Sequence, residues 1–270
     1  MRFFLFITQN KVNLSNYYLI EIQFLGYRFH GWQKQPNLKT VHLMIDRTIN
    51  YVLKNNKFKT LGTGRTDAMV SANQTAFELF TEIPLANFED FLELLNTNLP
   101  QDIRALKIKA VTKEFNVINH SKIKEYKYLF SEGTKNHPYS APFITTFLDS
   151  LNIDLMKKGA KLFKGQHNFK SYCYKPNENG IFDREIIYCE ISNNTTLKAN
   201  FFPEKSYELT VRGKGFMRNQ IRLMMGVLVE LGRGEASLEY IKESLNTYNP
   251  QINYIAPASG LMLNKVDFID

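Results

Sequence analysis

The pattern of apolar residues switches repeatedly between a period of two, which is typical of strands, and the longer period of an amphipathic helix. In the first half of the chain, residues 17–24, 75–81 and 103–111 predict strands. Helical spacing occupies residues 40–55 and 87–96. This order lacks the strict strand–helix alternation of a parallel sheet, so it favours largely antiparallel sheets with packed helices.

The second half repeats the order without repeating the letters. Its predicted strands cover residues 124–130, 184–191 and 206–213, and its predicted helices cover residues 154–163 and 216–232, the latter ending at Gly232. We therefore expect an α+β protein of two related α/β subdomains with largely antiparallel sheets. The subdomains are expected to join around a central active-site cleft, with helices on the outer faces.

The same patterns predict the domain limits. We expect an N-terminal extension over residues 1–15, an N-terminal subdomain over residues 16–113 and a C-terminal subdomain over residues 114–270. The initial apolar run MRFFLFI is short and is followed by polar residues, unlike a signal peptide. No run approaches the roughly 20 apolar residues that span a bilayer. We expect a cytoplasmic protein that does not enter a membrane.

The balance of charged residues bears on the partner. Lysine and arginine number 34 against 26 acidic residues, giving a net charge of +8 that is spread along the whole chain. Either a polyanionic partner such as nucleic acid or simple solubility accounts for this excess. The two cysteines, Cys173 and Cys189, and the five histidines lack metal-binding spacing, so we expect neither a disulfide framework nor a metal site.

The segment GTGRTDAMVSA, residues 62–72, places two glycines, an arginine and an aspartate between apolar runs. Gly62 and Gly64 lack side chains that would keep a ribose-phosphate chain away from the backbone. Asp67 supplies a carboxylate that can act as a nucleophile or stabilise a developing charge. The local letters alone favour a plain turn, in which Asp67 caps the backbone and Arg65 is solvated. Phosphate-loop spacing is absent.

Six separated segments, in order, resemble the TruA-type tRNA pseudouridine synthases. They are FLGYRFHGWQKQPNLKTV, GTGRTDA, LNTNLPQDIRALKIKAV followed by KEYKYLF, FKGQHNFKSY, GKGFMRNQIRLMMGVLVELGRG and APASGLML. The resemblance implies an isomerase that converts uridine to pseudouridine in tRNA, by default in the anticodon stem-loop at positions 38–40. It further implies a homodimer that needs no cofactor and no metal.

The resemblance also implies roles for individual residues. Asp67 corresponds to the catalytic carboxylate, Arg222 to its partner and Tyr126 to the active-site tyrosine. Strand alternation puts Tyr126 and Tyr128 on one face, and Tyr128 is the one expected in the core. The residues expected to bind substrate are Gly64, Arg65, which would fill the space left by the target base, Arg218, four residues before Arg222 on the expected helix, and Leu261, which would pack under the uracil.

The sequence departs from the family pattern in two places, and the first of them, at Met69 and Ser71, keeps a second hypothesis open. The usual loop continues as GRTDAGVHA, whereas here Met69 and Ser71 replace the glycine and the histidine. An arginine typical of the family is also missing from FNVINHS, residues 115–121. The alternative is a non-catalytic RNA-binding or RNA-folding protein on the same scaffold. A small-molecule hydrolase that uses Asp67 with a histidine is disfavoured, because neither a nucleophile elbow nor a metal set accompanies it.

Overall fold

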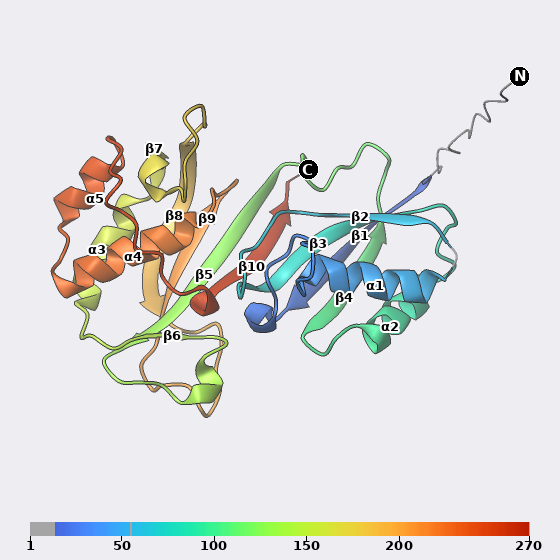
Figure 1. Cartoon of the computed structure of the whole chain (residues 1–270), viewed down its shortest axis with the longest axis horizontal. Coiled ribbons are helices and arrows are strands. Elements are labelled where there is room, and N and C mark those ends of the chain that lie inside the picture. The colour runs from blue at the N-terminus through green and yellow to red at the C-terminus, as the bar shows by residue number, and fades with distance from the viewer. Residues whose placement is uncertain (1–13, 55, 270) are drawn as a thin grey trace, which may run out of the picture.

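The structure is a computed structural model, which describes residues 14–54 and 56–269. The extension expected over residues 1–15 therefore lies almost wholly outside the described residues. The described chain builds one ten-stranded sheet with α-helices packed against it (Figure 1). This architecture confirms the α+β expectation, and no described helix is both long and apolar enough to cross a membrane.

The predicted elements occur in the expected order, together with four strands and one α-helix that the sequence patterns did not predict among the described residues. The strands are β1 (Asn16–Phe24), β2 (Phe58–Gly62), β3 (Ser71–Thr81), β4 (Ile103–Ala110), β5 (Lys122–Glu132), β6 (Thr145–Phe147), β7 (Gly165–Asn168), β8 (Asp183–Asn193), β9 (Tyr207–Gly213) and β10 (Leu261–Phe268). The α-helices are α1 (Val41–Leu53), α2 (Phe88–Asn98), α3 (Ile153–Leu162), α4 (Gln220–Arg233) and α5 (Leu238–Ser244). The side chains of Thr40 and Asn87 cap α1 and α2, because each accepts hydrogen bonds from first-turn amides.

The strands of both halves form one continuous sheet in the order β4-β1-β3-β10-β5-β9-β8-β7, with β2 added on β3 and β6 on β5. All pairings are antiparallel except β3 with β10 and β5 with β6. The largely antiparallel arrangement is therefore confirmed. Sequence reasoning expected a sheet in each half and did not identify β10, the strand that joins them.

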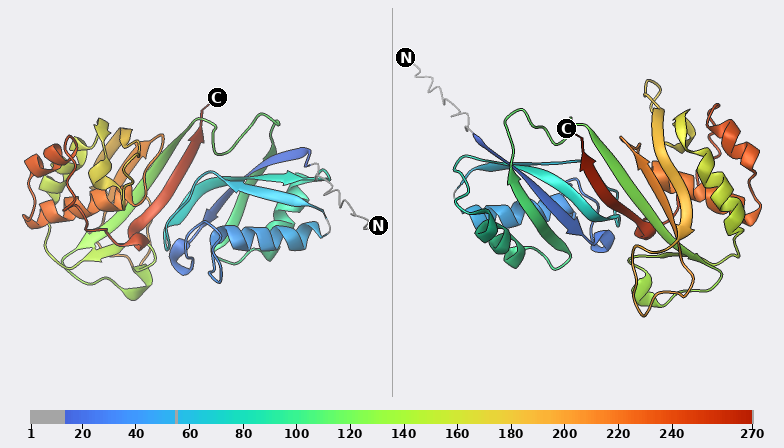
Figure 2. Two further views of the ribbon diagram at one scale, coloured as in Figure 1. Left: turned by 45° about the horizontal axis from the view of Figure 1, so that its top comes forward. Right: turned by 180° about the vertical axis from the view of Figure 1, so that it is seen from behind.

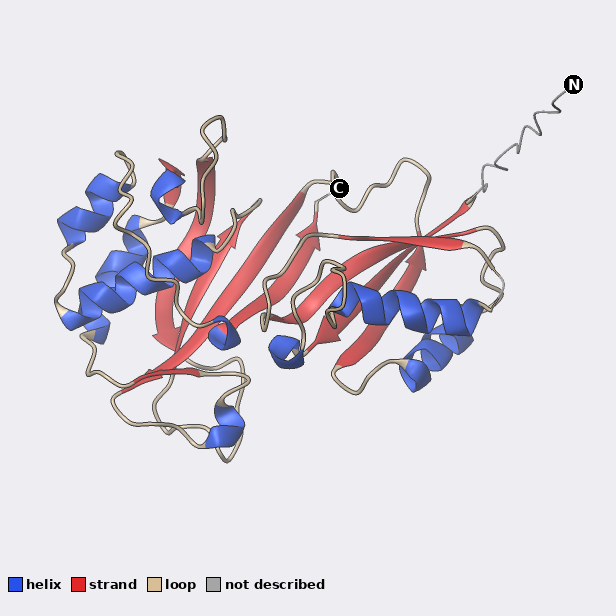
Figure 3. Cartoon of the chain, viewed as in Figure 1, coloured by secondary structure: helices blue, strands red, loops and turns tan. Residues whose placement is uncertain are grey.

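The α-helices gather on one face of this sheet (Figures 2 and 3). The predicted inward face of β1 faces them: Tyr18, Ile20, Ile22 and Phe24 are all buried. These residues belong to one apolar core that continues through β5 and α4 into the second half. Because this core is continuous, the helices of both halves stabilise the same sheet.

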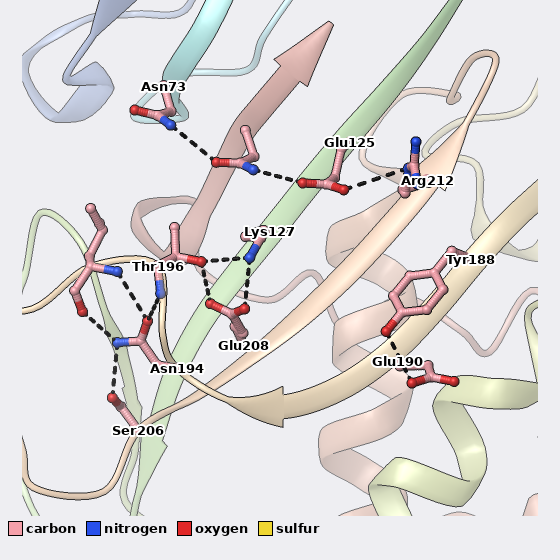
Figure 4. A network of polar contacts seen from close by, with 12 residues as sticks. Asn73, Glu125, Lys127, Tyr188, Glu190, Asn194, Thr196, Ser206, Glu208 and Arg212 are labelled. Atoms are coloured by element: carbon pink, nitrogen blue, oxygen red, sulfur yellow. Dashed lines mark hydrogen bonds and ion pairs between the residues drawn. The ribbon is translucent and has the colours of Figure 1, made fainter. Parts of the chain in front are cut away.

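The opposite face of the sheet is partly covered and partly polar. Leu19, Ala76 and Val117 form a small second core there, and the buried Glu78 accepts a hydrogen bond from the Val117 amide. Farther along, Glu125 alternates with Tyr126 on β5 and so points away from the helices. Figure 4 shows the polar chain on this face, which runs from β3 through β10 and β5 to β9 through Asn73, Asn264, Glu125 and Arg212.

The expected helix over residues 216–232 is wrong at both ends. It begins at Gln220, because Asn219 adopts a left-handed φ of 59° that interrupts the helical backbone. Arg218 therefore precedes the helix and does not share a helical face with Arg222. At the other end, α4 continues to Arg233, and Gly234 rather than Gly232 takes the left-handed capping conformation, with a φ of 80°.

The position of β10 in the middle of the sheet yields a test of stability. Leu263 is 4% exposed on this strand, and Leu263→Ala is expected to lower the free energy of unfolding by about 2–4 kcal/mol, because it leaves a cavity in the shared core. Chemical denaturation measures the change. The control, Ile181→Ala, alters a residue that is 77% exposed and should change stability by less than about 0.5 kcal/mol. Equal losses in the two variants would contradict a central role for β10.

Candidate active site

A cavity of about 840 Å³ lies between the glycine-rich loop and the segment that enters α4. Both halves of the chain line it, together with β5 and the start of β10. The residues predicted for the site that line the cavity are Gly64, Arg65, Asp67, Tyr126, Arg218 and Leu261. The remaining predicted residue, Arg222, reaches the site through Asp67. The fold thus gathers residues that lie nearly 200 positions apart in the sequence.

Asp67 and Arg222 form an ion pair across the two halves. The Arg222 Nη1 lies 3.7 Å from the Asp67 Oδ2, and the side chains are 17% and 36% exposed, respectively. Arg222 is held in place by donating from Nε to the Ala256 carbonyl at 2.7 Å and from Nη1 to the Asn219 Oδ1 at 3.2 Å. Because 3.7 Å is too long for a hydrogen bond, Arg222 orients the carboxylate by charge and leaves its lone pairs free.

Burial and the neighbouring charge shift the pKa of Arg222 in opposite directions. Burial lowers the pKa of Arg222, and the nearby Asp67 carboxylate raises it. An arginine remains protonated under all ordinary conditions, so the pair supplies a permanent positive charge next to the carboxylate.

Tyr126 lies on β5, and its side chain is close to the Asp67 carboxylate of the loop. Its side chain is buried, and both the burial and the Asp67 charge raise its pKa, so the phenol is neutral. Phe216 packs edge-on against its ring, with the ring centroids 5.3 Å apart. Tyr128 is fully buried, and its hydroxyl donates to the Pro257 carbonyl at 2.8 Å. The core position expected for Tyr128 is confirmed.

Backbone hydrogen bonds join the loop that carries Asp67 to the segment after β1. The Trp32 amide donates to the Thr66 carbonyl at 3.1 Å, and the Met69 amide donates to the Phe29 carbonyl at 3.0 Å. Gly31 adopts a φ of 85°, and a Cβ at this position would lie 2.7 Å from the Thr66 carbonyl oxygen. The segment GW, which sequence reasoning treated only as a matching motif, therefore sets the position of the loop.

The structure shows how the two departures from the family loop are accommodated. Met69 adopts a left-handed φ of 67°, a conformation in which a non-glycine residue carries about 1–2 kcal/mol of strain. Its side chain is 37% exposed and does not line the cavity. The buried Ser71 hydroxyl accepts a hydrogen bond from the Gly26 amide at 2.9 Å. Both substitutions are thus accommodated without blocking the cavity.

The remaining predicted residues line the cavity in different surroundings. Arg65 is exposed, and the Arg218 guanidinium stacks on Tyr174 at 4.9 Å from the ring centroid. Leu261 is buried opposite Tyr128 in the sheet register. Sequence reasoning missed Lys124, which also lines the cavity. The signal was available, because alternation along β5 places it on the same strand face as Tyr126.

Comparisons with known proteins agree with this geometry. A family model described as tRNA pseudouridine synthase matches residues 160–268. The tRNA pseudouridine synthase A of Thermosipho melanesiensis is 32% identical over 252 residues, which cover 93% of this chain and 99% of the relative. The chain belongs to the tRNA pseudouridine synthase A family.

Other members of the family are similar over the same extent. The Listeria monocytogenes member is 29% identical over 251 residues, covering 92% of this chain and 97% of its own. The member from Phytoplasma mali is 28% identical over 254 residues, covering 93% of this chain and 98% of its own. Pseudouridine synthases are isomerases, and membership places this chain in that enzyme class.

The role of Gly31 in placing the loop can be measured. Gly31→Ala should lower stability by more than about 1 kcal/mol, because it combines an unfavourable φ with a clash against Thr66. Gly133→Ala is the matched control: Gly133 has a similar φ of 82°, but no atom lies within 4 Å of an added Cβ. Thermal unfolding of both variants isolates the clash from the backbone strain. Losses of equal size would show that Gly31 does not support the loop.

Proposed function

We propose that this chain isomerises uridine to pseudouridine in tRNA, with Asp67 as the catalytic carboxylate. The observation that carries the proposal is the position of Asp67 in the cavity, 3.7 Å from Arg222 and beside the buried Tyr126. A carboxylate with free lone pairs, held next to a fixed cation, can act as a nucleophile or stabilise a cationic centre.

The reaction adds no atoms to the substrate and removes none overall. The bond from ribose C1′ to uracil N1 breaks, the uracil turns, C1′ bonds to C5, the C5 proton leaves to solvent, and N1 takes up a proton in its place. Asp67 can serve by adding to the sugar, by adding to the ring, or by stabilising the charge that develops when the bond breaks. The ion pair with Arg222 is compatible with each of these three roles, because it orients the carboxylate while its oxygen lone pairs stay free of hydrogen bonds from Arg222.

The other cavity residues supply the contacts that a flipped nucleotide needs. Tyr126 and Leu261 offer an aromatic ring and an apolar surface for the uracil, and stacking of this kind contributes about 1–3 kcal/mol per base. Arg65 lines the cavity and is exposed, so its planar cation can replace the target base in the helix. Arg218 is directed by Tyr174 and can contact a phosphate. Gly64 allows the RNA backbone to approach closely.

We further propose that the target uridines lie in the anticodon stem-loop at positions 38–40 and that the chain acts as a cytoplasmic homodimer. The family resemblance supports both statements, and the net charge of +8 suits a polyanionic substrate. The competing function is RNA binding without catalysis. Its motivation was the pair Met69 and Ser71, yet neither side chain lines the cavity.

The central test is tritium release from tRNA that carries 5-tritiated uridine, measured under single-turnover conditions. Wild type should release tritium, and Asp67→Asn should slow the release by about three orders of magnitude or more, because the amide is neither a nucleophile nor an anion. Asp154→Asn is the matched control, because that carboxylate is 86% exposed on α3. Tight tRNA binding without release by wild type would favour the non-catalytic alternative.

The orienting role of Arg222 makes a second prediction. Arg222→Lys keeps the charge but cannot reproduce both contacts, to Ala256 and Asn219, while facing Asp67. The single-turnover rate should fall at least about tenfold. Arg233→Lys makes the same change at the other end of α4, where Arg233 pairs with Asp149 at 2.7 Å, and should leave the rate unaltered. An unchanged rate in Arg222→Lys would mean that charge alone suffices.

A further inference from the structure

Lys124 is a cavity residue to which the proposed reaction assigns no task. It lies on β5 two residues before Tyr126 and lines the same cavity as Asp67. Its amine occupies the space next to Gly64, where an added Cβ would lie 2.5 Å from the Lys124 Nζ. The glycine at position 64 therefore makes room for this amine as well as for a substrate.

The surroundings of Lys124 differ from those of its neighbours on the strand. Its only hydrogen bond to the described residues goes to the Thr63 carbonyl at the long distance of 3.4 Å, and it forms no ion pair with them. By contrast, the Lys122 amine donates to three backbone carbonyls, and Lys127 pairs with Glu208 at 2.7 Å. Among the described residues, Lys124 is thus a half-buried cation with no anionic partner and only one long hydrogen bond.

Burial makes the charged form of Lys124 unfavourable in the free protein. Burial, with a smaller contribution from Lys122, lowers the pKa of Lys124 to about 8. An anion that entered the cavity would offset the cost of burying the charged ammonium, because it would pair with it.

We propose that the Lys124 ammonium binds a phosphate of the RNA strand at the target nucleotide, in the space beside Gly64. This inference rests on the proposed function, since it identifies how the same cavity holds its substrate. A phosphate fits better than a uracil carbonyl, because it carries a full negative charge before any bond breaks. A neutral carbonyl would leave the buried cation without a counter-charge in the bound complex.

The contact couples binding to protonation. The ionisable groups around the amine are Lys122 and Tyr126 on the same strand, Arg65 and Asp67 on the loop, Arg218 before α4, and His30 after β1. Above pH 8 the free amine is mostly neutral and must take up a proton when the phosphate binds. Affinity for tRNA should therefore fall as pH rises through 8 and beyond.

The experiment compares tRNA dissociation constants for the wild type, Lys124→Met, Lys124→Arg and a control, Lys158→Met, which removes an exposed charge on α3. Lys124→Met should weaken binding roughly five- to twentyfold and reduce the slope of log Kd against log salt by about one. At constant ionic strength, wild-type Kd should rise roughly three- to sevenfold between pH 8 and 9.5, because loss of the proton can cost no more than loss of the amine. Lys124→Arg should lack this rise, because arginine stays protonated.

The outcomes separate this inference from the proposed reaction. If Lys124→Met matches Lys158→Met in Kd and salt slope, the phosphate contact is refuted. If it binds normally but releases tritium more slowly, the amine acts on the base or sugar, and the phosphate assignment is also wrong. If wild type binds tRNA but never releases tritium, the proposed reaction fails while the Kd comparison still decides the phosphate contact. Melting temperatures of all variants check that each is folded.

Discussion

The pairing of β10 with β3 on one side and β5 on the other is the interaction on which the site depends. The parallel contact with β3 is short, covering Met262 opposite Ser71 and Leu263 opposite Ala72. Directly beyond it, the backbone of β3 leads back into the loop that carries Asp67. On the other side, Leu263 lies opposite Tyr126. A single strand therefore fixes the separation between the loop of one half and the tyrosine of the other.

Placement of the Asp67 carboxylate also relies on left-handed backbone conformations, which are unfavourable for residues other than glycine. Met69 is held at a left-handed φ, and Gly31 is the residue that allows the preceding segment to lie against Thr66. Asn219, also left-handed, ends the approach to α4 and turns its side chain toward Arg222. Strain of this kind persists only where surrounding hydrogen bonds determine the geometry. Here the amides of Trp32 and Met69 supply those bonds.

Much of this fold could be predicted from sequence, because local periodicity and capping decide the long elements. The capped helices α1 and α2 and the strands β1 and β5 follow directly from those signals. The start of α4 could not be predicted, because apolar residues continue through Phe216 and Met217, where they pack beside the cavity rather than along a helix. The role of β10 was equally hidden, since strand order depends on contacts between distant residues.

The candidate site likewise has features that the sequence predicts and features that only the structure shows. The family resemblance located Asp67 and singled out Tyr126, whereas strand alternation alone puts Tyr126 and the core residue Tyr128 on the same face. The weak bonding of Lys124 could not be predicted from the sequence, because three lysines lie within six residues of β5. Only the structure shows which of them has a single long hydrogen bond, and no ion pair, to the described residues. The hydrogen bond of the Ser71 hydroxyl could not be predicted either, because its partner, the Gly26 amide, is 45 residues away in the sequence.

The position of β4 at the end of the sheet order has a consequence for how copies of the chain can meet. An unpaired strand edge offers free amides and carbonyls to any other extended chain. On β4, however, Arg104, Lys107 and Lys109 are all exposed, so a second β4 brought alongside would face a row of like charges. At the opposite end, β7 is only four residues long. Both ends of the main strand order thus discourage growth of the sheet from one molecule into the next.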